Sequence, residues 1–162
     1  MIRHRASVCI DAPAIAVWER LARLEEIELW SEVVVAAECP AGRSRGVGAE
    51  RVCRLVGGVT IRERWLEWDE GIGFVYEGVG IPLVASARNR WMVQPHGDQT
   101  MLVSEAEVRL KRRWFGRLLS MLVALQIRRV ARRTLAAFAY LVEHGEAPAV
   151  KHARLPVPAQ AC

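Results

Sequence analysis

Isolated polar side chains occur on apolar faces in the middle of the chain. Four segments in which polar and apolar residues alternate each carry one on their more apolar face: Glu63, Tyr76, Asn89 and Ser104. In a dry core, each unpaired group would cost about 1–3 kcal/mol. A pocket with a few orienting polar groups accounts for all four. The alternative is that they satisfy one another or bind trapped water.

Glu63 is the group best suited to acid–base chemistry. A carboxyl that faces an apolar cavity has a raised pKa, which suits a general acid or base. Tyr76 and Arg64 are the other candidate catalytic residues. The inward register of segment 59–69 stays open, because the opposite register would turn Arg64 and Trp68 inward in place of Glu63. An orienting or structural role for Glu63 is therefore the alternative to catalysis.

Other motifs for catalysis or metal binding lack the context they need. Gly42-Arg43-Ser44-Arg45-Gly46 matches G-x-S-x-G by letter, but a nucleophile elbow requires a strand before it and a helix after it. Gly46-Val47-Gly48 and Gly71-Ile72-Gly73 lack the third glycine of a dinucleotide-binding loop. No metal-ligand spacing occurs, so we expect no metal or other cofactor.

Cysteines 9, 39, 53 and 162 form no close pairs in the sequence. They indicate neither a disulfide framework nor a zinc site, and we expect small buried side chains except at the terminus.

The elements that must position these residues follow from periodicity and turn chemistry. Residues 2–10 alternate as a strand does, and two short helices follow within residues 11–30. Strand-like runs separated by short turns then occupy 33–38, 47–56, 59–69, 72–77, 83–94 and 100–110. A helical period returns over 114–143. We expect one domain over 1–145 and a disordered tail over 146–162.

This order of elements resembles the polyketide cyclase/dehydrase branch of the START-like (SRPBCC, Bet v 1-like) superfamily. The supporting pieces are Asp11-Ala12-Pro13 leading to Trp18, Trp30, Gly46-Val47-Gly48, Glu67-Trp68-Asp69, Trp91-Met92-Val93-Gln94-Pro95 and Gly97-Asp98-Gln99-Thr100. The resemblance covers about residues 2–143. It implies an α+β helix-grip fold: a seven-stranded curved antiparallel sheet, with two short helices after the first strand, wraps around a long C-terminal helix. It also implies an apolar cavity between sheet and helix.

The expected cavity lining combines inward strand residues with one face of the long helix. The predicted ligand-binding residues are Trp30, Ile61, Glu63, Trp65, Phe74, Tyr76, Asn89, Trp91, Ser104, Val123 and Ile127. Among them, Trp30, Trp65, Tyr76 and Trp91 are the expected apolar walls, and Glu63 and Asn89 the orienting groups.

The opposite face of the long helix has an unusual composition. Its first half is apolar, with Trp114, Leu118, Met121, Leu122 and Leu125, and its second half is cationic, with Arg128, Arg129, Arg132 and Arg133. Such a patch is typical of an interface. Cover by a loop or the short helices, a homodimer, and an anionic membrane surface all remain open. Nucleic acid is disfavoured, because no aromatic platform or recognition helix accompanies the arginines.

Charge and hydropathy limit the class of protein. Residues 1–110 carry 13 Arg and 16 Asp plus Glu, while residues 111–162 carry 10 Lys plus Arg and 2 Glu. The net charge of +5 therefore comes from the C-terminal segment. No run reaches the ~18 apolar residues of a membrane span, and residues 1–7 do not resemble a signal peptide. We expect a cytoplasmic protein, with peripheral membrane contact as an option.

Three functions remain open at this stage. The first is binding, with or without transport, of a small hydrophobic molecule such as a lipid, isoprenoid or polyketide. The second, which the resemblance equally implies, is a polyketide aromatase/cyclase-type enzyme. The third is an interaction or dimerisation module without a ligand.

Overall fold

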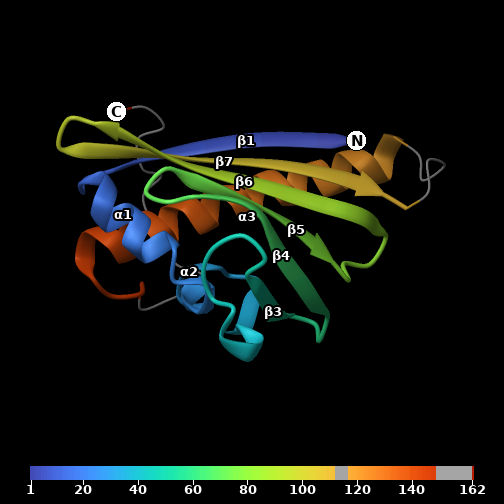
Figure 1. The fold of residues 1–162 in the computed structure, drawn as a ribbon. Helices are drawn as coiled ribbons and strands as arrows, with labels where there is room; N and C mark the ends of the chain where they lie inside the picture. The colour runs from blue at the N-terminus through green and yellow to red at the C-terminus, as the bar shows by residue number, and fades with distance from the viewer. Residues whose placement is uncertain (112–116, 149–161) are drawn as a thin grey trace.

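The fold consists of a curved antiparallel sheet that lies over one long helix (Figure 1). The computed structural model describes residues 1–111, 117–148 and 162. The strands are β1 (Ile2–Ile10), β2 (Val34–Glu38), β3 (Glu50–Leu55), β4 (Thr60–Asp69), β5 (Gly73–Val79), β6 (Val84–His96) and β7 (Gln99–Leu110). Their order in the sheet is β1-β7-β6-β5-β4-β3-β2.

The helices are α1 (Ala14–Leu21), η1 (Leu24–Glu26), α2 (Ile27–Trp30), η2 (Pro40–Gly42) and α3 (Arg117–His144). The helix-grip fold is thereby confirmed. Residues 114–116 of the predicted helix and 149–161 of the predicted tail lie outside the described residues.

The register of β4 settles the question that the sequence left open. Ile61, Glu63 and Trp65 are buried, so the predicted inward face of the strand is confirmed. A bulge between Trp65 and Glu67 then shifts the register. Because a bulge sets two residues against one on the neighbouring strand, Trp68 also turns inward and stacks on Phe74 at 5.4 Å between ring centroids.

The last third of α3 closes the apolar core. Leu135, Phe138 and Leu141 are almost fully buried, and each contributes about 1.5–3 kcal/mol by leaving water. In the first half of the helix, Val123 and Ile127 lie on the same face but remain partly accessible. The two halves of α3 are therefore packed unequally against the sheet.

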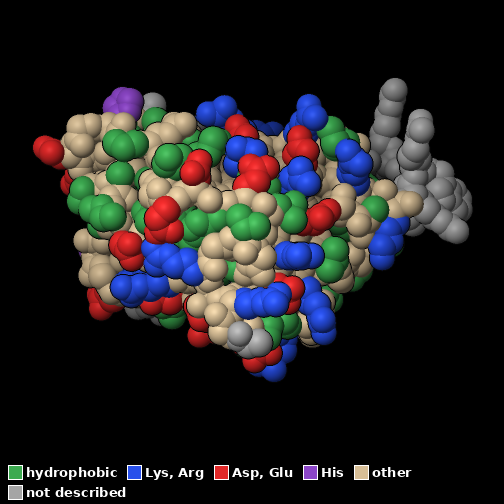
Figure 2. All heavy atoms as spheres, in the orientation of Figure 1, with side chains coloured by type: hydrophobic (Ala, Val, Ile, Leu, Met, Phe, Trp, Pro, Cys, Tyr) green, Lys and Arg blue, Asp and Glu red, His purple; other side chains and the backbone are tan. Residues whose placement is uncertain are grey.

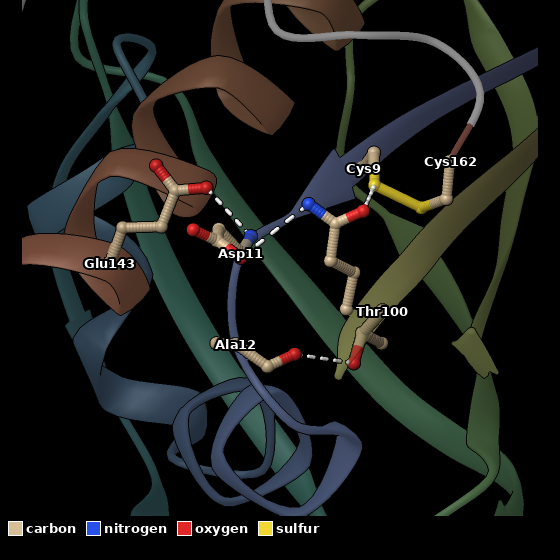
Figure 3. Close-up of a disulfide and its surroundings, with 7 residues drawn as sticks. Cys9, Asp11, Ala12, Thr100, Glu143 and Cys162 are labelled. Atoms are coloured by element: carbon tan, nitrogen blue, oxygen red, sulfur yellow. Dashed lines mark hydrogen bonds between the residues drawn. A yellow bond between two sulfur atoms is a disulfide. The ribbon is translucent and has the colours of Figure 1, made fainter. Parts of the chain in front are cut away.

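Hydrogen bonds fix the C-terminal end of α3 to the end of β1. The backbone N–H of Asp11 donates to a carboxylate oxygen of Glu143 at 2.9 Å, and the Thr100 hydroxyl donates to the Ala12 carbonyl at 2.7 Å (Figure 3). Arg20 donates to the carbonyl of Gly145 at 3.2 Å. This end of the helix is held by Asp11 and by α1, and Thr100 on β7 in turn holds the segment that follows β1.

The turn after β4 holds that strand to α1. The carboxylate of Glu70 accepts hydrogen bonds from the indoles of Trp18 and Trp68, at 2.9 and 2.7 Å, and from Arg45. These donors, Arg45 first, lower the pKa of Glu70 to about 2. Glu70 thus stabilises the turn through its side chain.

The expectation that no cysteine pair forms is wrong for Cys9 and Cys162. Their sulfur atoms form a disulfide that joins the outward face of β1 to the last residue of the chain (Figure 3). The two residues are 153 positions apart, so sequence spacing carried no signal of the pairing. Cys39 and Cys53 are free, and Cys53 is buried as expected.

The disulfide gives the first testable prediction. In denatured but unreduced protein, only Cys39 and Cys53 should react with a thiol-specific alkylating reagent, as counted by intact mass. Cys162→Ser should lower the free energy of unfolding in urea by about 2–4 kcal/mol, because the cross-link constrains the unfolded chain. Alkylation of all four cysteines without reductant would contradict the pairing.

Candidate functional site

One line of cross-strand neighbours crosses the concave face of the sheet. Each member is paired with the next on the neighbouring strand. In order they are His4 on β1, Ala106 on β7, Asn89 on β6, Tyr76 on β5 and Trp65 on β4. We call these five residues the polar row. Because side chains of directly paired residues point to the same face of a sheet, His4, Asn89 and Tyr76 all face the interior.

Three of the four predicted polar residues satisfy one another. The Ser104 hydroxyl donates to the side-chain oxygen Oδ1 of Asn89 at 3.1 Å. The side-chain nitrogen Nδ2 of Asn89 donates to the Tyr76 hydroxyl oxygen at 3.3 Å. The mutual pairing that the sequence allowed is thus present. The Tyr76 hydroxyl oxygen accepts this hydrogen bond, so the hydroxyl proton remains available. No acceptor for that proton occurs among the described residues.

Burial and the nearby Glu63 carboxylate raise the pKa of Tyr76 to about 12. The phenol is therefore protonated at neutral pH. It can donate a hydrogen bond or a proton, but it cannot act as a base there.

Glu63 is paired, contrary to the expectation of an isolated carboxyl. Arg51 on β3 is opposite it, and the guanidinium meets one carboxylate oxygen of Glu63 through Nε at 2.7 Å and Nη2 at 2.6 Å. The Cys53 thiol donates to the same oxygen at 3.5 Å. Only 3% of the Arg51 side chain and 7% of the Glu63 side chain are exposed.

Arg51 also connects the sheet to the short helices. Its Nη1 donates to the Leu24 carbonyl at 2.7 Å, and its guanidinium carbon lies 5.0 Å from the ring centre of Trp65. All three guanidinium nitrogens of Arg51 therefore contact an oxygen atom. Sequence reasoning missed this residue, although pairing β3 with β4 around Gly57 places it directly opposite Glu63.

Arg64 does not face the interior, so the prediction that it could be a catalytic residue is wrong. It lies exposed on the outward face of β4, opposite Glu50 and Glu77 in the neighbouring strands. Strand alternation that turns Glu63 inward necessarily turns Arg64 outward.

The other predicted site residues divide into two groups by accessibility. Trp30, Ile61, Trp65, Phe74, Trp91 and Ser104 are buried. Tyr76, Asn89, Val123 and Ile127 are partly accessible although they face the interior. Near the accessible group, the concave face carries the small residues Gly78, Ala87 and Ala106. The concave face is therefore built from smaller side chains here than around Phe74 and Trp91.

Four buried polar atoms have no partner among the described residues: His4 Nε2, Trp30 Nε1, Trp65 Nε1 and Thr134 Oγ1. His4 and Trp65 end the polar row, while Trp30 packs edge-on against Trp91 and Phe138 at 5.8 and 5.1 Å. Unpaired buried polar groups are uncommon in native proteins and call for water or a ligand. Burial, with Arg128 and Arg132 nearby, lowers the pKa of His4.

The outer face of the sheet has a depression of about 640 Å³, but its charges are largely paired. The ion pairs Arg3–Glu107, Arg5–Glu105 and Arg90–Glu67 span 2.9, 3.3 and 2.9 Å. Figure 2 shows acidic and basic side chains interspersed over this side. Among the described residues no cluster of His, Cys, Asp and Glu could hold a metal ion.

The outward patch of α3 is exposed where it is described. Met121, Leu122 and Leu125 are each more than half exposed, so no described loop or helix covers them. Of the arginines, Arg133 pairs with Glu32 at 2.7 Å. Trp114 lies outside the described residues, and so does the side chain of Leu118.

Comparison with known proteins gives a consistent result. The sequence profile of the family described as polyketide cyclase/dehydrase and lipid transport matches residues 1–143. A search of curated proteins found no significant match.

Three solved structures are similar in fold. The Zhui aromatase/cyclase from Streptomyces sp. R1128 superposes with a TM-score of 0.73 at 20% identity, over 88% of this chain and 94% of that one. A protein from Thermus thermophilus superposes with a TM-score of 0.74 at 22% sequence identity, over 89% of this chain and 99% of that one. A START superfamily protein from Mycobacterium smegmatis superposes with a TM-score of 0.67 at 14% sequence identity, over 86% of this chain and 98% of that one.

The buried ion pair yields a stability prediction. Arg51→Met should lower the free energy of unfolding by about 3–5 kcal/mol, because it leaves the Glu63 carboxylate buried without its partner. The double variant Arg51→Met/Glu63→Leu should recover most of that loss. Urea denaturation of the two variants measures both. Equal losses in the single and the double variant would show that the pairing itself is unimportant.

Proposed function

Because the chain belongs to the polyketide cyclase/dehydrase and lipid transport family, we propose that it binds a small hydrophobic molecule between the concave face of the sheet and α3. The bound class would be a lipid, isoprenoid or polyketide. The molecule would lie against the predicted lining residues and carry oxygen atoms toward the polar row.

The unpaired polar atoms of the interior are the observation that carries this proposal. Two of them, the indole N–H groups of Trp30 and Trp65, can only donate hydrogen bonds. Tyr76 adds a third available donor through its hydroxyl proton. Donors set in an apolar surround suit a mainly apolar ligand with carbonyl or hydroxyl oxygens. A hydrocarbon without oxygen would leave these donors unsatisfied.

Accessibility supports the same location. Val123 and Ile127 on α3 remain partly accessible. These residues are apolar and face inward, so a ligand would remove them from water. Native mass spectrometry of freshly purified protein, followed by extraction, would identify the bound class and test whether this is instead a module without a ligand.

Filling the space should remove binding without unfolding the protein. We expect Ala106→Phe to weaken binding of the extracted ligand, or of an apolar fluorescent probe, by at least about tenfold, because the ring takes up the site. Met101→Phe is the matched control, because Met101 lies on the outward face of the same strand. Titration of both variants measures the effect, and equal binding would place the ligand elsewhere.

An aromatase/cyclase-type enzyme is the second candidate function. The observation that favours it is the protonated Tyr76 phenol, which can donate to a ketone oxygen and so polarise the carbonyl. Glu63 is less suited to move protons, because Arg51 and Cys53 engage its carboxylate. The residue expected to carry chemistry is therefore Tyr76.

Tyr76→Phe separates the two candidates. It removes only the hydroxyl, so ligand affinity should change by less than about tenfold. If the protein is an enzyme, turnover of a poly-β-ketone should fall by about a hundredfold or more, since general acid catalysis contributes about that much. Steady-state kinetics on wild type and variant, with the aromatic product measured by chromatography, decides. Unchanged turnover would remove Tyr76 from the mechanism.

A further inference from the structure

One end of the molecule combines basic and apolar exposed side chains. The pairing of Arg62 with Val79 and of Val84 with Leu110 brings the start of β4, the β5–β6 connection and the end of β7 together. A hydrogen bond of 2.9 Å from Lys111 N–H to the Leu83 carbonyl closes this group. Figure 1 shows the β5–β6 connection, the N-terminus and the start of α3 at the same end, on the right.

We call this region the basic end. It comprises Arg54, Val56, Arg62, Val79, Leu83, Arg109 and Lys111, all of which are exposed. Val56, Val79 and Leu83 are 66%, 52% and 49% exposed, far more than their apolar character favours. Leu83 also has a positive φ of 64°, a conformation that is uncommon for a leucine.

The basic end has no acidic side chain of its own. Residues 52–62, 78–87 and 108–142 contain no Asp or Glu. Among the described residues, no salt bridge includes Arg54, Arg62, Arg109 or Lys111. Elsewhere on the sheet the arginines are largely paired with glutamates, as in Arg3–Glu107 and Arg90–Glu67. Unneutralised positive charge is therefore concentrated at this end.

We propose that the basic end docks on an anionic lipid bilayer. Exposed valine and leucine side chains would enter the interface between headgroups and acyl chains, while the arginines and the lysine meet the lipid phosphates. No described helix is long and apolar enough to cross a bilayer.

Charge complementarity favours lipid over a second copy of the chain. A two-fold dimer through this end would bring together two surfaces that both carry uncompensated positive charge, and neither contains a carboxylate to offset it. An anionic bilayer supplies the missing negative charge over a wide area and accepts the apolar residues as well.

The test compares binding to vesicles of phosphatidylcholine alone with binding to vesicles that also contain phosphatidylglycerol, measured by co-sedimentation. We expect binding only to the anionic vesicles, weakened by added salt. Arg62→Gln and Arg109→Gln should each lower the partition coefficient about fivefold. Arg43→Gln is the matched control, because Arg43 is exposed but lies in the connection between β2 and β3.

A second pair of variants tests the apolar contribution. Leu83→Asn should lower the partition coefficient at least about fivefold and should not destabilise the fold, because asparagine tolerates a positive φ better than leucine does. Ile72→Asn is its control, since Ile72 is similarly exposed but lies at the opposite end of β5. Circular dichroism checks that each variant is folded.

Two outcomes would overturn the proposal. One is equal or absent binding to both kinds of vesicle. The other is a change in oligomeric state on Leu83→Asn in light scattering, which would assign the surface to self-association. Vesicle binding is measured separately from ligand binding in the interior, so failure of either leaves the other intact.

Discussion

The unequal anchoring of α3 is the constraint on which the rest of the structure depends. A curved sheet that faces a single helix can be closed only where that helix is held against it. Here the helix is held at its C-terminal end, by Glu143 on the Asp11 backbone and by Phe138 against Trp30. Further toward its N-terminal end, the helix leaves Val123 and Ile127 partly accessible. The described side-chain contacts thus hold α3 most firmly near its C-terminal end.

The Arg51–Glu63 pair solves a different problem in the same interior. A buried ion pair contributes little net stability compared with apolar residues of similar volume, since both ions must leave water. Its value here lies in position: one guanidinium holds Glu63, the Leu24 carbonyl and the Trp65 ring in a single arrangement. The short helices are thereby fixed relative to β3 and β4. Glu63 acts as part of the scaffold of the site.

The predictable features were those that follow from periodicity. Alternation placed Glu63, Asn89 and Ser104 inward, and helical spacing separated Ile127 from Leu122. Contacts between distant segments could not be obtained in this way. The Cys9–Cys162 disulfide leaves no local pattern, because it depends on which distant segments become neighbours. The role of Arg51 requires β3 and β4 to be paired across the turn at Gly57, which periodicity alone does not provide. The bulge after Trp65 likewise needs the partner strand to define it.

Side-chain size along the strands differs between the two ends of the concave face. Two neighbouring cross-strand lines lie roughly 7 Å apart, two residues along each strand. One consists of Ala6, Ser104, Trp91, Phe74 and Trp68, and its aromatic rings fill the concavity. Two lines away, the neighbours are Ile2, Val108, Ala87, Gly78 and Glu63, with almost no bulk at their centre. Glu63 itself reaches over Gly78, with its Cγ 3.7 Å from the position that a Cβ atom would take there. The small side chains of this line and the partial accessibility of Val123 and Ile127 are the features on which the proposed position of the ligand rests.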